Sequence, residues 1–129
     1  MSSVDRALTG DVLTFKLDDE IRHLRASLAT SQARSARTLV KEGPQGPLSM
    51  TLVGLKPGGS MREHDARGPV TLHVLEGDVT LETGGKSFAL SAGAVAALGP
   101  GIRHAVSSAD GGIFLLTVTA TSHSGAAFD

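Results

Sequence analysis

The sequence predicts an all-β barrel or jelly roll preceded by one short helix. Short strand-like segments recur at regular spacing after residue 37, and no helical pattern separates them. The sixteen glycines lie mostly after Gly43, where they suit the tight turns of such a fold. The 129 residues fit one domain. We expect an N-terminal arm and helix at 1–36, a barrel at 37–119 and a flexible tail at 120–129.

The helix is expected over residues 19–33, with Asp18 or Asp19 as its N-terminal cap. Its apolar residues are spaced three and four apart and share one face; they are Ile21, Leu24 and Leu28. This narrow stripe predicts a helix that lies on the flank of the barrel or against a second subunit. Together with a short N-terminal strand, Val12 to Leu17, it favours a homodimer.

The barrel is expected to contain about eight antiparallel strands. They are 37–41, 48–55, 70–75, 79–83, 86–90, 94–98, 104–107 and 113–119. Gly84-Gly85 is a two-residue hairpin connection, and Glu76-Gly77-Asp78 is interpreted as a turn that closes a strand. Gly77 and Gly101 are expected at positive φ, where a Cβ is costly.

Composition excludes several classes of function. The absence of cysteine excludes disulfides, thiolate nucleophiles, zinc ribbons and iron–sulfur clusters. A formal net charge of −1, evenly spread, argues against nucleic acid as a partner. No signal peptide or membrane-spanning run is apparent, so we expect a cytoplasmic protein without a membrane partner.

Two glycine-anchored segments carry the functional signal. The first has Gly58, His64, Ala66, Val70 and Gly77; the second has Gly93, Gly99-Pro100-Gly101 and His104. They resemble the two motifs of the cupin superfamily, Gly-x5-His-x-His-x3–4-Glu-x6-Gly and Gly-x5-Pro-x-Gly-x2-His-x3-Asn. The resemblance implies a double-stranded β-helix (an RmlC-like jelly roll) of the small single-domain bacterial kind.

The resemblance also implies a metal site, but this sequence departs from the family at the ligands. Family members hold Fe, Mn, Ni or Zn with the histidines and glutamate of these motifs. Here Ala66 stands at the second histidine position, Val70 at the glutamate position and Ser108 at the asparagine position. His64 and His104 remain, and two imidazoles make at most a weak site. No organic cofactor is expected.

His73 is a candidate third ligand. Strict alternation along its strand makes it face away from the pocket, unless a bulge within residues 66–69 shifts the register. The alternative is a histidine packed in the strand.

Charged residues beside the motifs have two interpretations each. Glu63 or Asp65 could orient the His64 ring or belong to a solvated rim. Arg103 could hold a carboxylate at the barrel mouth or be an ordinary surface residue.

Three functions are therefore considered. The first is a small-molecule-binding protein with a pocket at the barrel mouth, lined by His64, Val70, Leu72, Val74, Leu98, Arg103, His104 and Phe114. The second is a metal-dependent dioxygenase or isomerase in which His64, His73 and His104 hold the metal and Glu63 or a metal-bound water moves protons. The third is a structural or regulatory dimerisation module.

Overall fold

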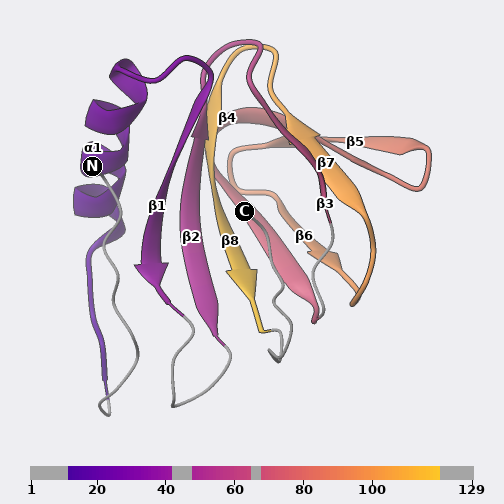
Figure 1. Ribbon diagram of the computed structural model, residues 1–129, viewed down its shortest axis with the longest axis horizontal. Helices are drawn as coiled ribbons and strands as arrows, with labels where there is room; N and C mark the ends of the chain where they lie inside the picture. Colours follow the sequence, from indigo (N-terminus) through magenta and orange to yellow (C-terminus); the bar gives the residue numbers. More distant parts are fainter. Residues whose placement is uncertain (1–11, 42–47, 65–67, 120–129) are drawn as a thin grey trace.

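The protein is described from a computed structural model that covers residues 12–41, 48–64 and 68–119, the side chains of Glu63 and His64 excepted. Within these residues, one helix precedes eight antiparallel strands (Figure 1). The elements are α1 (Leu17–Ala29), β1 (Arg34–Val40), β2 (Ser49–Leu55), β3 (Ser60–His64), β4 (Val70–Thr83), β5 (Lys86–Ser91), β6 (Val95–Leu98), β7 (His104–Ser107) and β8 (Gly112–Val118). The predicted all-β fold with one N-terminal helix is confirmed.

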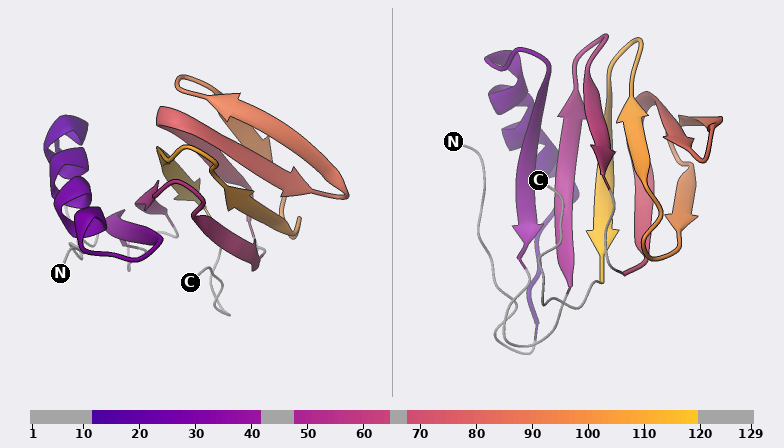
Figure 2. Two further views of the ribbon diagram at one scale, coloured as in Figure 1. Left: turned by 90° about the horizontal axis from the view of Figure 1, so that it is seen from above. Right: turned by 45° about the vertical axis from the view of Figure 1, so that its right-hand side comes forward.

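The strands form one curled sheet in the order β1-β2-β8-β4-β7-β3, with β5 and β6 each paired to β4. The long strand β4 links the two parts of the sheet. Its first half pairs with β6 and β8, and its second half pairs with β5 and β7. Seen from above, the sheet curls back on itself and α1 lies outside it (Figure 2). Strands β1 and β3 are the two ends of the path, so the barrel is open between them.

The two strands predicted at 70–75 and 79–83 are one continuous strand, and the turn predicted between them is wrong. The register of β4 against β8 shifts between Val74 and Glu76, which is a bulge rather than a turn. Gly77 has φ +73°, and a Cβ there would run into the carbonyl oxygen of Gly111. This glycine therefore permits a close backbone approach inside a strand.

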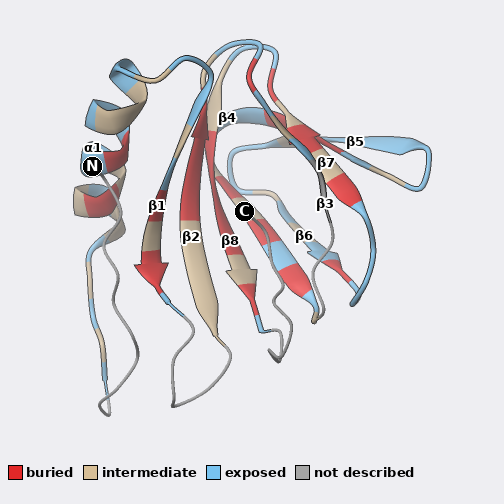
Figure 3. Cartoon of the chain, in the orientation of Figure 1, coloured by how far each residue is buried: buried red, intermediate tan, exposed pale blue. Residues whose placement is uncertain are grey.

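Strand β3 was not among the predicted strands, because Ser60–His64 is polar and lacks strand-like alternation. The hairpin at Gly84-Gly85 is confirmed. Both glycines have positive φ, +59° and +76°, and Thr83 is paired with Lys86 across the turn. The β4–β5 hairpin projects from the body of the barrel and is largely exposed (Figures 1 and 3).

The helix begins earlier than expected. Lys16 is its N-cap and has no side-chain capping bond, so the predicted cap at Asp18 or Asp19 is wrong. Both aspartates lie instead in the first turn, where a negative charge is favourable to the helix dipole. Residues 12–16 form no strand, which corrects the expected N-terminal strand.

The apolar stripe of α1 packs on the outer face of the protein's own sheet. Leu24 is fully buried in an outer cluster whose other buried members are Leu39, Val40, Leu52, Ile113 and Leu115. Gly54 lies beneath the helix, and a Cβ there would be 3.2 Å from Leu24 Cδ2 and 3.1 Å from Leu28 Cδ2. The stripe therefore covers the barrel flank, and it gives no support to a subunit interface.

A buried ion pair fastens the same helix to the edge strand β1. Arg37 Nε donates to Glu20 Oε1 at 2.6 Å, and both side chains are less than a tenth exposed. A buried charge pair contributes little net stability but makes one geometry much better than its alternatives. The pair thus fixes how α1 sits on β1.

The barrel interior is filled by a second apolar cluster. Its buried members are Val53, Leu55, Val70, Leu72, Val74, Val79, Leu81, Leu98, Val106, Phe114, Leu116 and Val118. Burial is concentrated on β8 and on the second half of β2, residues 52–55 (Figure 3). Over the described residues, no helix has the length and apolar character needed to cross a membrane.

Candidate ligand site

His104 is a buried polar group at the start of β7. Its side chain is 1% exposed, and its Nδ1 lies 3.0 Å from the backbone carbonyl oxygen of Ile102. A carbonyl oxygen can only accept, so Nδ1 is the donor and carries the hydrogen. In the neutral ring, Nε2, which is also buried, then presents its lone pair. His104 is thus oriented as an acceptor or a metal ligand.

The backbone of His64 lies directly opposite that of His104. The register of β3 against β7 pairs Met61 with Val106, shifts once, and then pairs His64 with His104. The two histidines of the motifs therefore lie on neighbouring strands. The roles considered for the Glu63 side chain and for Asp65 lie outside the described residues.

His73 lies on the outer face of the barrel wall. It alternates with Leu72 and Val74, which are both fully buried in the interior cluster. It is paired with Leu115, a member of the outer cluster. The register from Val70 to Val74 is continuous, and the bulge in β4 comes after His73, so no shift turns this side chain inward.

The five apolar residues predicted to line the pocket form core instead of cavity wall. Val70, Leu72, Val74, Leu98 and Phe114 are between 0% and 8% exposed, and all belong to the interior cluster. They lie on the predicted inner face of the barrel, where their side chains pack together as core.

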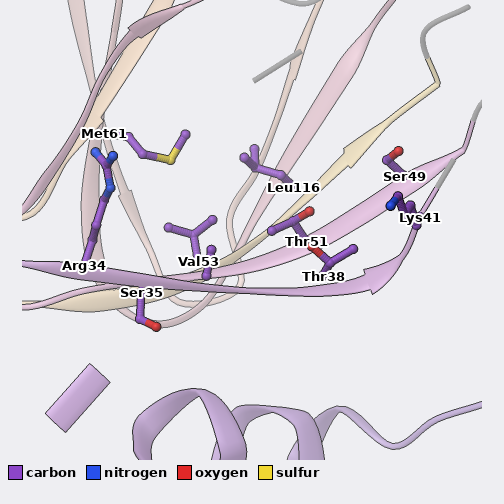
Figure 4. Close-up of a pocket in the computed structure, with 10 residues that line it drawn as sticks. Arg34, Ser35, Thr38, Lys41, Ser49, Thr51, Val53, Met61 and Leu116 are labelled. Carbon is purple, nitrogen blue, oxygen red and sulfur yellow. The ribbon is translucent and has the colours of Figure 1, made fainter. Parts of the chain in front are cut away.

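A cavity of about 560 Å³ opens between the two end strands of the sheet (Figure 4). It is lined by Arg34, Ser35, Ala36, Thr38, Lys41, Ser49, Thr51, Val53, Met61 and Leu116. No Asp or Glu is among these described residues, whereas two side chains are cationic. Sequence reasoning missed this site, although one signal was present. Ser49, Thr51 and Val53 alternate with Met50 and Leu52, which marks a partly polar face on β2.

The inner wall of the cavity is formed by the interior core. Val53 and Leu116 belong to the interior cluster, and Met61 packs against it. Met61 is paired with Val106, which lies two residues after His104 on the same face of β7, about 7 Å away. His104 therefore lies on the same inner side of the barrel as Met61, behind core residues, and is not itself among the residues that line the cavity.

Arg34 spans the opening. Its Nη1 donates to the backbone carbonyl oxygen of Ser60 at 3.2 Å, which links the first residue of β1 to the first residue of β3. The side chain extends from β1 toward Met61 (Figure 4). This contact joins β1 and β3, the two end strands, which are not paired with each other in the sheet.

Two further motif residues have positions that can be stated. Ser108, at the family's asparagine position, is 2% exposed; its hydroxyl donates to Asp78 O at 2.5 Å and accepts from Gly111 N–H at 2.8 Å. It therefore holds the turn before β8. Arg103 is exposed, its carbonyl oxygen accepts from Thr83 Oγ1 at 2.8 Å, and it does not line the cavity at β1.

The fold and the two glycine-anchored motifs agree with the comparison of this sequence with known protein families. The sequence model of the cupin domain matches residues 51–119, more than half of the chain, and the chain belongs to this family. No curated protein matches it in sequence.

Solved structures agree with the fold. A conserved protein of unknown function from Streptococcus pyogenes superposes with a TM-score of 0.68 at 20% identity, covering 95% of this chain and 98% of that one. A cupin superfamily protein from Desulfitobacterium hafniense gives 0.64 at 16% identity over 74% and 87%. Salicylate 1,2-dioxygenase from Pseudoaminobacter salicylatoxidans gives 0.72 at 13% identity over 81% of this chain and 32% of its own. At identities this low, the structural similarity shows a shared fold and nothing more.

The donor set does not fit the metal centre that is common in this family. Cupins commonly bind transition metals, but the family's glutamate position is Val70, an apolar residue 2% exposed. His73 faces outward, and the second histidine position, Ala66, has no donor atom in its side chain. His104 and His64 are left, which is fewer than the three protein ligands of a typical catalytic site.

Proposed function

We propose that this protein is a small-molecule-binding cupin whose ligand enters between β1 and β3 and reaches an inner pole formed by His64 and His104. The observation that carries the proposal is the cavity of about 560 Å³, a size usual for small-molecule sites, whose inner wall is formed by residues of the interior cluster. His104 supports it as a buried acceptor with a fixed tautomer. The backbone pairing of His64 with His104 supports including both residues in this pole.

The proposal includes at most a weak metal site. A dioxygenase or isomerase with His64, His73 and His104 as ligands would need His73 inside the barrel, and its pairing with Leu115 argues against that. Likeness to salicylate 1,2-dioxygenase in fold alone does not supply the missing ligands.

Metal binding separates the two functions. We expect tag-free protein to contain metal well below one equivalent by elemental analysis. Any heat seen on titration with Mn²⁺ or Zn²⁺ should disappear in His64→Ala and in His104→Ala, and persist in the matched control His73→Ala. Stoichiometric metal that is lost in His73→Ala would instead establish the three-histidine metal site that the dioxygenase or isomerase requires.

Ligand binding tests the proposal itself. Imidazole signals in a ¹H–¹³C correlation spectrum should shift for His104 when a small-molecule ligand binds, while His73 on the outer face serves as an internal reference. A ligand that shifts His73 and leaves His104 unchanged would place binding elsewhere.

We also propose a homodimer, now on different grounds. The helix stripe is used within the chain, but Phe88, Val95 and Ile102 are large apolar residues that are 44% to 59% exposed. Sedimentation equilibrium detected in the far ultraviolet, since Trp and Tyr are absent, should give twice the 13.2 kDa chain mass. A monomer at micromolar concentration would contradict the dimer and the dimerisation-module function together.

A further inference from the structure

We infer that the cavity between β1 and β3 selects a small organic anion with an apolar body, and that Arg34 binds its carboxylate. This inference rests on the proposed function, because it names the class of ligand for the same cavity. It is argued from the charges, the walls and the fixed position of one guanidinium.

The cavity has a positive charge that the described residues do not neutralise. Three other arginines pair with carboxylates: Arg22 with Asp19, Arg25 with Glu76, and Arg37 with Glu20. Within the described part of the chain, Arg34 and Lys41 have no carboxylate partner, and no acidic residue lines the cavity with them. A concave, partly apolar site with one sign of charge attracts ligands of the opposite sign.

Arg34 is already held in place. Its bond to the Ser60 carbonyl uses one of its five N–H donors and fixes the guanidinium at the opening. The remaining donors of this planar group match the two oxygens of a carboxylate. Because part of the side-chain ordering is complete before the ligand arrives, less free energy is lost on binding.

The walls next to Arg34 define the rest of the ligand. Val53, Met61 and Leu116 form an apolar surface beside the guanidinium (Figure 4). Farther along, Thr38 and Thr51 are directly paired across β1 and β2 and offer two half-buried hydroxyls. These walls fit a ligand with a carboxylate at one end, a short apolar body, and a group at the other end that accepts or donates a hydrogen bond.

Lys41 lies too far away to share that carboxylate. It follows Arg34 by seven residues and comes directly after the end of β1, which is a separation of roughly 20 Å along the backbone. In Figure 4, Lys41 and Ser49 lie at the opposite end of the cavity from Arg34. Lys41 contributes attraction over distance, and Arg34 is the specific contact.

A matched series of three probes tests the inference: sodium hexanoate, hexanamide and hexylamine, which share a chain and differ in charge. Titrations are followed by ¹H–¹⁵N spectra and by the methyl signal of Met61. We expect hexanoate to bind about tenfold or more tightly than hexanamide and to shift Thr38, Thr51 and Met61, while hexylamine does not bind. The preference should weaken as salt is added.

Variants assign the contact. Arg34→Gln should remove the preference for hexanoate over hexanamide, and Arg34→Lys should keep part of it. Lys41→Gln should weaken hexanoate less than about threefold. The matched control is Arg22→Gln, which removes an exposed arginine of α1 and should change nothing.

The outcomes distinguish the two proposals. Equal binding of hexanoate and hexanamide, or a hexanoate preference that survives Arg34→Gln, overturns the inference but leaves a small-molecule pocket in place. If none of the three probes shifts a residue of the cavity or His104, the proposed function fails with it.

Discussion

The two halves of this barrel use the same strand geometry for different purposes. In β8, four consecutive residues, Ile113 to Leu116, are buried, because one face meets the barrel interior and the other meets the cluster under α1. In β1 only the outer face is well buried, and its buried residues include Arg37 and Leu39. On the inner face, Arg34 and Ala36 are exposed.

The difference follows from position in the sheet. Strand β8 has neighbours on both sides, β2 and β4, whereas β1 ends the path and is paired with β2 alone. A central strand with two covered faces favours a continuous apolar run, and an end strand can keep polar side chains on one face. Stability therefore depends mainly on the β4–β8 half, and access to the interior on the β1–β3 half.

The largest expected loss of stability comes from a substitution in the packed β4–β8 half. Phe114 is fully buried in β8, and Phe114→Ala should lower the free energy of unfolding by about 3–5 kcal/mol through lost burial and a new cavity. Urea unfolding followed by circular dichroism measures it. The control is Thr51→Ala in the open half, a half-buried residue that lines the cavity and should cost less than about 1 kcal/mol.

Equal losses in these two variants would contradict the comparison. They would mean that the cavity wall at β2 is as important to the fold as the core at β8.

An intermediate effect concerns two glycines that both have positive φ. Gly77 lies within β4, where a Cβ would meet the backbone of Gly111 and Gly112; Gly101 lies in a turn, where nothing is within 4 Å of the added atom. Gly101→Ala should cost about 1 kcal/mol for its conformation alone. Gly77→Ala should cost about 2–4 kcal/mol, because steric overlap with rigid backbone adds to that. Thermal unfolding followed by circular dichroism compares the two variants. Equal losses of stability would show that the backbone at Gly111 can move away from Gly77.

Much of the fold could be predicted from local chemistry. The Gly84-Gly85 hairpin and the spacing of Ile21, Leu24 and Leu28 each determine a structure within a few residues, and both predictions are confirmed. The join at Gly77 could not be interpreted in the same way. A glycine flanked by acidic residues is typical of a turn, and only its long-range contact with Gly111 identifies it as a bulge inside a strand.

The candidate site was less predictable, because it depends on which strands end the sheet. Alternation along β4 correctly gives the inner face to Leu72 and Val74 and the outer face to His73. It does not tell whether an inner face is filled or hollow. The cavity arises where β1 and β3 fail to pair, and Arg34, near the predicted boundary between arm and barrel, becomes a mouth residue only through that topology.

The smallest expected effect on stability is also the sharpest test of the division between the halves. Arg34 is exposed, and the hydrogen bond from its side chain to Ser60 O, at 3.2 Å, crosses the opening. Arg34→Gln should therefore change the free energy of unfolding by no more than about 0.5 kcal/mol, as is usual for exposed side chains. Urea unfolding of the variant beside the wild type checks this, with Arg22→Gln as the surface reference. A loss above about 2 kcal/mol would show that Arg34 closes the barrel as a structural clasp, because an exposed bond of this kind cannot otherwise contribute so much. A stable variant that has lost its preference for hexanoate would show the opposite: that the residue bridging the open edge serves the ligand, and that the barrel does not need the bridge to fold.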